Sequence, residues 1–213
     1  VPFSEEFYNK DAEHNYYANG VCADVEEVLS DLNIDGKILA DYAAGYMWGT
    51  LGIVYNPEEI PEEEATTWEL FLNKDYAKRI TIKDSVRDSF FGALCIHYQD
   101  RLLDEGFIGS LEYREEINRI LNDTTPETVE EIENILTKMK ENVYSFETDS
   151  GKADLITGKV IANMQWSGDG VYTIDEVSEE GVDLCYCVPK EAGNIWFDAW
   201  CMLKDGVGED AKK

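Results

Sequence analysis

The residues best suited to binding chemistry lie near the end of the chain, in the stretch 194–200 (NIWFDAW). This apolar run follows a Pro-containing turn and predicts a strand, whose side chains alternate between two faces, so Trp196 and Asp198 should share one face. An indole ring beside a carboxylate suits an alkylammonium ion, because the ring attracts the cation and covers its methylene groups while the acid neutralises it. A plainer interpretation also fits the pattern: the aromatic side chains form core and Asp198 caps a turn.

Two other stretches place polar side chains directly after predicted strands: 84–88 (DSVRD) and 166–169 (WSGD). Ligands of open α/β sheets gather outside the carboxyl ends of the strands, so we expect these stretches and 196–198 to converge. Asp88 has an alternative role, since Ser85-x-x-Asp88 is a helix-capping arrangement and a helix N-terminus stabilises acids. Trp166 is expected at a turn, where functional residues are common. Arg87 is expected to pair with a nearby acid and is given no ligand role.

The elements that must position these residues alternate between strand and helix. The patterns predict strands over 46–56, 79–83, 143–146, 160–164, 184–188 and 195–200, and helices over 24–32, 66–72, 86–103, 111–121, 126–139, 152–157 and 171–180. The helix at 66–72 should open with the capping box Thr66-x-x-Glu69, and the turn 166–170 should lead into the helix at 171. Such alternation predicts an α/β fold with a mixed, mostly parallel sheet flanked by helices.

The strong negative charge narrows the classes of partner. The chain has 213 residues and a formal net charge of −27. A nucleic-acid partner is therefore not expected, because phosphate backbones require a basic surface. The same field favours cations such as polyamines, metal ions or basic peptides, although acidity also serves solubility alone. The acidic turn at 58–64 is interpreted as solvated surface.

Little in the chain suggests a metal centre, a cofactor or catalysis. The five cysteines (Cys22, Cys95, Cys185, Cys187 and Cys201) lack zinc-binding spacing and are expected to be mostly buried free thiols. His97 falls within a predicted helix and is interpreted as a packing residue. No apolar run reaches the length of about 20 residues that spans a bilayer. The chain begins Val1-Pro2-Phe3, so any targeting segment is expected to have been removed or to lie upstream.

Four motifs, taken together and in order, resemble the spermidine/putrescine-binding proteins of polyamine ABC transporters. They are 46–56 (YMWGTLGIVYN), 84–88 (DSVRD), 164–169 (MQWSGD) and 188–191 (VPKE) continuing through 196–198 (WFD). The resemblance covers about residues 42–204, and residues 1–41 match poorly. It implies the two-lobed fold of type II periplasmic binding proteins, in which the ligand is held between lobes joined by crossing strands.

The resemblance also implies a division of the chain. Residues 1–56 would hold an N-terminal segment and hinge strand from a partial first lobe, 57–194 the second α/β lobe, and 195–213 the returning hinge strand and a truncated end. Family members extend further on both sides, so the chain resembles a fragment whose missing first lobe would be a partner. The implied setting is extracytoplasmic, with a lipid anchor or a fusion to the permease.

Transferred residue by residue, the family's polyamine contacts fall on Asp88, Trp166, Trp196 and Asp198, with Asp84 and Ser85 as further candidates. The two indoles would sandwich the methylene chain, and the acids would hold the ammonium groups. The implied function is capture of spermidine or putrescine for a membrane permease, without catalysis and without a cofactor.

Three alternatives remain at this point. In the first, the ligand differs, since related type II proteins bind ferric ion, thiamine or phosphonates. Acid and indole side chains suit neither iron nor an anion, whereas a thiamine-like cation could bind both the acid and the indole. An enzyme with paired carboxylates, such as a glycosidase, is a second alternative. The third is a lobe that binds no ligand and only contacts a permease.

Overall fold

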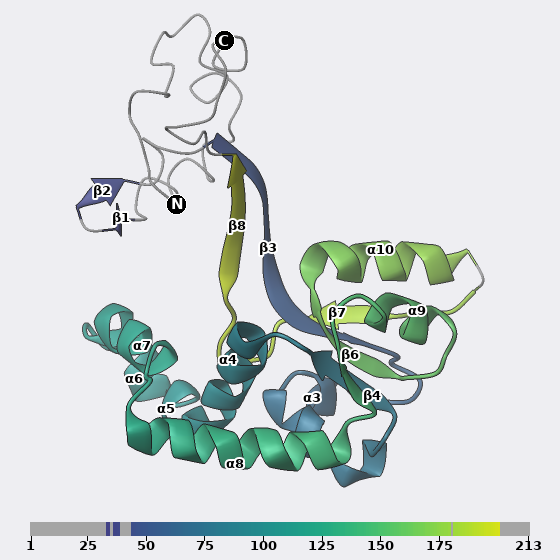
Figure 1. Ribbon diagram of the computed structural model, residues 1–213, viewed down its shortest axis with the longest axis horizontal. Helices are drawn as coiled ribbons and strands as arrows, with labels where there is room; N and C mark the ends of the chain where they lie inside the picture. The colour runs from purple at the N-terminus through teal and green to yellow at the C-terminus, as the bar shows by residue number, and fades with distance from the viewer. Residues whose placement is uncertain (1–32, 35, 39–43, 180, 201–213) are drawn as a thin grey trace, which may run out of the picture. The chain divides into compact units, whose positions relative to one another are not determined.

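The computed structural model describes residues 33–34, 36–38, 44–179 and 181–200 (Figure 1). The helix expected at 24–32 lies outside these described residues. The strands are β1 Asn33–Ile34, β2 Lys37–Ile38, β3 Ala44–Tyr55, β4 Ile80–Lys83, β5 Ser145–Glu147, β6 Ala162–Trp166, β7 Cys185–Cys187 and β8 Ile195–Trp200. The α-helices are α3 Glu62–Ala65, α4 Val86–His97, α5 Gln99–Leu102, α6 Glu105–Ile108, α7 Tyr113–Leu121, α8 Pro126–Asn142, α9 Gly151–Ile156 and α10 Ser167–Ser178; η3 Trp68–Leu72 and η4 Lys74–Tyr76 are 3₁₀ helices.

A six-stranded mixed sheet organises most of these elements. Its order is β5-β4-β6-β3-β7, with β8 paired to β3. β4 is parallel to β5 and to β6. β3 is antiparallel to β6 and to β7, so β4, β5, β6 and β7 all run in one direction and β3 runs against them. The predicted α/β fold with a mixed, mostly parallel sheet is confirmed.

Helices cover both faces of the sheet, and the side chains of β3 alternate between the apolar clusters on these two faces. Leu51 and Ile53 belong to a large apolar cluster that also contains residues of η3, α4, α7 and α8. Val54, which points to the opposite face, packs with Leu155 of α9 and Val177 of α10. Because successive strand residues face opposite ways, β3 contributes to both cores. Figure 1 shows α9 and α10 on one side of the strands and α4 and α8 on the other.

The chain divides into two compact units. One is Gly49–Ile195, and the other joins Val1–Trp48 with Trp196–Lys213. The chain passes from one unit to the other twice, within β3 between Trp48 and Gly49 and within β8 between Ile195 and Trp196. The domain boundaries expected at 56–57 and 194–195 remain a prediction.

Local sequence signals place several helix starts as expected. Thr125 is the N-cap of α8 with Pro126 at the first position, and Ile132 and Met139 are buried on its inner face. Ser85 caps α4, its Oγ accepting from the Asp88 N–H at 3.3 Å. Gly158 and Gly181 follow α9 and α10 with φ of 66° and 78°, a conformation that glycine adopts without strain.

One predicted helix boundary was wrong, and one predicted packing residue is exposed. The helix expected over 86–103 breaks at Tyr98 into α4 and α5. His97, which was interpreted as a packing residue, is exposed, and its ring centroid lies 4.5 Å from that of Tyr98. The buried side of α4 contains the polar residues Asp88 and Ser89 together with apolar residues such as Phe91 and Leu94.

Two further predictions need correction at helix starts. The short helix after residue 66 is a 3₁₀ helix capped by Thr67, whose Oγ1 accepts from the Glu69 N–H, and not by Thr66. The strand predicted over 160–164 is β6, which continues to Trp166, and α10 starts at Ser167 without the expected intervening turn. Trp166 is therefore a strand residue and the N-cap of α10.

The described part of the chain includes the predicted acidic turn and three of the five cysteines. Glu58, Glu59, Glu62 and Glu63 of the predicted acidic turn are exposed, as expected, whereas Glu64 is half-buried and accepts from Asn73 Nδ2 and the Tyr76 hydroxyl. Cys95, Cys185 and Cys187 are free thiols; Cys95 is buried and the other two are half-buried, while Cys22 and Cys201 lie outside the described residues. Burial raises the pKa of the Cys187 thiol to about 11, so it is neutral at physiological pH. Across the described ranges, no helix is both long and apolar enough to cross a membrane.

The closest backbone approach in the sheet yields a prediction about Gly52. A Cβ at this position of β3 would lie 2.3 Å from the Cys187 carbonyl oxygen and 2.6 Å from the Tyr186 ring. We expect Gly52→Ala to lower the free energy of unfolding by about 1–3 kcal/mol, because β7 must move away from β3. Urea denaturation would measure this change.

Gly168, in the first turn of α10, provides the matched control. A Cβ there has nothing within 4 Å. Gly168→Ala should leave stability unchanged or raise it by roughly 0.5–1 kcal/mol. Equal effects of the two substitutions would show that β7 is not held against β3 as described.

Candidate functional site

The candidate site is the edge of the sheet where β4 and β6 end. These strands are parallel neighbours with Ile80 opposite Ala162 and Thr81 opposite Asn163, so their carboxyl ends lie side by side. α4 follows β4 and α10 follows β6, which places two helix N-termini at the same edge. Parallel pairing thus brings together the predicted stretches 84–88 and 166–169 within the unit Gly49–Ile195.

Asp88 is the most unusual acid at this edge. It is 2% exposed, and its Oδ2 has no hydrogen-bond partner among the described residues. Its Oδ1 lies 3.7 Å from Nε of Arg87, whose side chain is 83% exposed. The expected pairing of Arg87 with an acid is confirmed. The capping arrangement accounts for the position of the Asp88 backbone N–H, but it leaves one buried carboxylate oxygen without a donor.

Asp84 and Ser85 flank this acid. The Asp84 carboxylate is exposed, while its backbone N–H donates to the Glu147 carbonyl at 2.7 Å. Ser85 is half-buried and serves as the N-cap of α4. α4 is also held to the end of β4 by Ser89, whose Oγ donates to the Lys83 carbonyl at 2.5 Å. The backbone at this edge is therefore pinned on both sides of Asp88.

Trp166 is half-buried at the end of β6, and one of its faces carries a cation from the protein itself. Nζ of Lys83 lies 4.4 Å from the centroid of the Trp166 ring. Lys83 ends β4 and is 1% exposed, so this contact is sealed from solvent. A lysine at such depth requires partners.

Those partners form a buried polar network beneath the ring. Nζ of Lys83 lies 3.1 Å from Oε1 of Glu147 and donates to the Thr148 carbonyl at 2.8 Å. Glu147 also accepts from the Gly151 N–H at 2.7 Å and from Asn163 Nδ2 at 3.0 Å. A Cβ on Gly151 would lie 2.5 Å from Asn163 Nδ2, so only glycine fits at the start of α9 without displacing the network.

Sequence reasoning did not identify Lys83 or Glu147. The available signal was a lysine at the last position of the strand ITIK, directly before the acid of the DSVRD motif. Alternation alone would have placed that lysine on a solvent-facing side, whereas β4 is buried on both faces. Its role depends on β5, a strand that is about 60 residues away in sequence and adjacent in the sheet.

Trp196 and Asp198 lie on β8, in the other unit. Asp198 is exposed within the strand, so it does not cap a turn. Trp196 is half-buried, and its Nε1 is buried without a hydrogen-bond partner in the described parts of the chain. The strand predicted for this stretch is confirmed, and the period of two places both side chains on one face.

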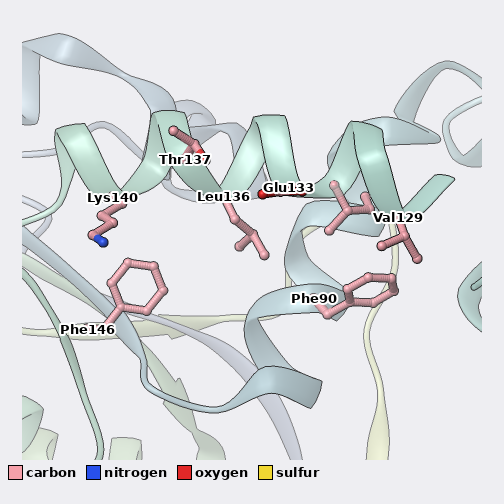
Figure 2. A pocket seen from close by; sticks show the side chains of 8 residues that line it. Phe90, Val129, Glu133, Leu136, Thr137, Lys140 and Phe146 are labelled. Atoms are coloured by element: carbon pink, nitrogen blue, oxygen red, sulfur yellow. The ribbon is translucent and has the colours of Figure 1, made fainter. Parts of the chain in front are cut away.

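A groove lies away from the predicted site residues. It is an apolar groove of about 370 Å³ between α8 and the elements α4 and β5. Figure 2 shows Phe90 near Val129 at one end and Phe146 near Lys140 at the other, with Leu136 between them. Its only carboxylate comes from Glu133, so the groove lacks the paired acids expected for a linear dication.

Metal ligation is not supported by the described residues. No group of three or more His, Cys, Asp and Glu side chains that could hold a metal ion occurs among them. The arrangement at the edge instead combines a buried acid with an incomplete set of donors and an aromatic ring. Such a pair can accept an ammonium group and pack against a hydrocarbon chain.

The chain matches the family of bacterial extracellular solute-binding proteins over residues 6–212 and belongs to that family. Among its relatives is the putrescine/agmatine-binding protein of Pseudomonas aeruginosa, 24% identical over 187 residues that cover 82% of this chain and 47% of the relative. The spermidine/putrescine-binding periplasmic protein of Escherichia coli K12 is 25% identical over 159 residues, covering 75% and 39%. The chain spans about half the length of the curated relatives it matches, or less.

Solved structures agree with the fold. The spermidine/putrescine ABC transporter substrate-binding protein PotD of Streptococcus pneumoniae superposes with a TM-score of 0.66 at 24% identity, covering all of this chain and 54% of PotD. The Tp0655 lipoprotein of Treponema pallidum gives a TM-score of 0.65 at 19% identity, covering 88% and 51%. At these identities the likeness supports the fold alone, an α/β fold like that of type II periplasmic binding proteins.

The unsatisfied oxygen of Asp88 leads to a prediction about stability. Asp88→Asn should raise the free energy of unfolding, by on the order of 1 kcal/mol, because burying a neutral amide costs less than burying a carboxylate that lacks a donor. Urea denaturation in the absence of ligand would measure the change.

Asp84→Asn is the matched control, since it removes the same charge from an exposed side chain four residues earlier. It should change stability by less than about 0.5 kcal/mol. A loss of stability in Asp88→Asn would mean that Arg87 and the N-terminus of α4 already satisfy the carboxylate.

Proposed function

We propose that this chain contributes a polyamine-binding site to a solute-binding protein of an ABC transporter, with spermidine or putrescine as ligand. The observation that carries the proposal is Asp88, a carboxylate that is 2% exposed and has one oxygen without a donor, at the edge where Trp166 ends β6. Relatives named for binding putrescine, agmatine and spermidine support the choice of ligand class.

An alkylammonium group supplies what Asp88 lacks. A primary ammonium carries three N–H donors and a positive charge, so it can complete the hydrogen bonding of Oδ2 and neutralise the acid in one contact. The hydrocarbon chain that follows would pack against Trp166, which removes apolar surface from water. The net charge of −27 raises the local concentration of such cations.

We assign the remaining contacts from the sequence resemblance. Trp196 and Asp198 of β8 would provide a second indole and a second acid, and Asp84 and Ser85 would act beside Asp88. The buried, unpartnered Nε1 of Trp196 supports a binding role for that residue, because core indoles usually find an acceptor. No bond is made or broken in this function.

The wider role follows from the family. We propose that the protein acts outside the cytoplasm and delivers its ligand to a membrane permease, with the rest of the ligand contacts supplied by a first lobe. A lipid anchor or a fusion to the permease would keep it at the membrane. The periplasmic location and transporter membership of the named relatives support this setting.

A titration of the chain with spermidine tests the proposal. The indole N–H signal of Trp166, assigned through Trp166→Phe, should shift saturably at up to millimolar ligand, against a control of sodium chloride at equal ionic strength. Trp68 serves as the internal control, since it is fully buried and its Nε1 donates to the Ala192 carbonyl at 3.1 Å. If every indole drifts together, or none moves beyond the salt control, the acidic surface only attracts cations diffusely and the proposal fails. A response to thiamine and none to spermidine would favour another organic cation.

Removal of the second acid gives a separate prediction. Asp198→Asn should weaken spermidine binding by about 10–100-fold, the loss expected for one charge-assisted hydrogen bond. Asp100→Asn, which removes an equal charge from an exposed position of α5, should change the affinity less than about twofold. Equal effects of the two substitutions would show that Asp198 acts only through the net charge.

A further inference from the structure

Lys83 directs all of its ammonium donors into the protein. One direction meets Glu147 Oε1 at 3.1 Å, a second meets the Thr148 carbonyl at 2.8 Å, and the ring of Trp166 lies 4.4 Å away. A lysine ammonium has three N–H groups and no acceptor, so these contacts use its full capacity. Because Lys83 is 1% exposed, water does not compete for these contacts.

Stability alone does not explain this arrangement. Two charges buried in the sheet lose their hydration, and well-packed apolar side chains in place of a buried ion pair are often as stable or more stable. Glu147 is 5% exposed, so both partners bear this cost. Locally, the ion pair places the Lys83 ammonium against one face of the Trp166 ring, at the edge proposed to bind ligand.

A cation on one face of an indole changes what the other face prefers. The attraction of a ring for a cation arises from the negative charge of its π system, which Lys83 already draws toward itself. A second cation on the opposite face would meet a weaker attraction from the ring and a repulsion from Lys83 that the ion pair with Glu147 reduces. A methylene segment is not subject to either effect, since it packs by apolar contact.

We propose that Lys83 is a positioning residue that fixes the half-buried Trp166 and makes the ring face opposite the ammonium select the hydrocarbon segment of a linear polyamine over an ammonium group. The proposal rests on the proposed function of Trp166 as a ligand contact. Trp166 then contacts the hydrocarbon segment of the ligand, and the acids bind the ammonium groups.

The test compares a compact cation with a polyamine on the same ring. Tetramethylammonium and spermidine would each be titrated while the Trp166 indole signal is followed, in the original chain and in the double variant Lys83→Met/Glu147→Gln. The double variant removes both buried charges and keeps the side-chain lengths, so no unpaired carboxylate remains. Lys83→Arg retains a cation at the same place.

The chain offers a matched control pair. Nζ of Lys159 lies 4.4 Å from the Tyr144 ring centroid and 2.9 Å from Asp154 Oδ1. The control variant Lys159→Met/Asp154→Asn therefore removes the same two charges from another lysine–aromatic contact.

In the double variant, the ratio of the dissociation constants for tetramethylammonium and spermidine at Trp166 should fall on the order of tenfold, the size of one cation–π contact. The control variant and Lys83→Arg should leave this ratio within about threefold. The Trp166 signal of the ligand-free double variant should also shift, while that of Trp68 should not. An unchanged ratio with a folded double variant would overturn the proposal.

The original chain provides a second test if the double variant does not fold. Trp166 should then respond to spermidine and remain unmoved by tetramethylammonium at equal charge concentration, and an equal response to both would overturn the role of Lys83. Failure of the proposed function is a different result, because Trp166 would then ignore spermidine in every variant.

Discussion

The buried ion pair between Lys83 and Glu147 is the interaction on which the candidate site depends. It joins the ends of β4 and β5 at 3.1 Å, and Asn163 and the Gly151 N–H tie the same carboxylate to β6 and α9. Both charges have partners: Lys83 contacts Glu147 and the Thr148 carbonyl, and Glu147 also accepts from Asn163 and Gly151, which offsets part of the cost of burying them. The network therefore demands a defined register among three strands, and the position of Trp166 follows from that register.

The site combines satisfied and unsatisfied polar groups at one edge of the sheet. Glu147 has a full set of partners, whereas Asp88 keeps one buried oxygen without a donor in the described structure. An ammonium group that supplied a donor to this oxygen would meet a partner that is already in place, and preorganised partners bind more tightly than groups that must first be arranged. Glu147 therefore belongs to the scaffold of the edge, and Asp88 is the proposed ligand contact.

Membership of the bacterial extracellular solute-binding proteins gives this physical description its context. The fold covers about half of the related structures, and the unit Gly49–Ile195 contains β4, β5, β6 and β7 together with the helices that cover both faces of the sheet. Both crossings out of this unit occur within the paired strands β3 and β8. The acid and the indole proposed as ligand contacts on β8 lie in a different part of the chain from those proposed at the sheet edge.

The sequence by itself determined the fold class, most of the elements and the residue types of the candidate site. Alternation and capping signals were sufficient for β3, β4, α8 and β8, because these depend on neighbours within a few residues. Only the tertiary structure decided that Asp88 is buried without a full set of partners and that Lys83 covers one face of Trp166. Both facts arise from strands that are distant in sequence and adjacent in the sheet, and a local pattern does not encode burial of that kind.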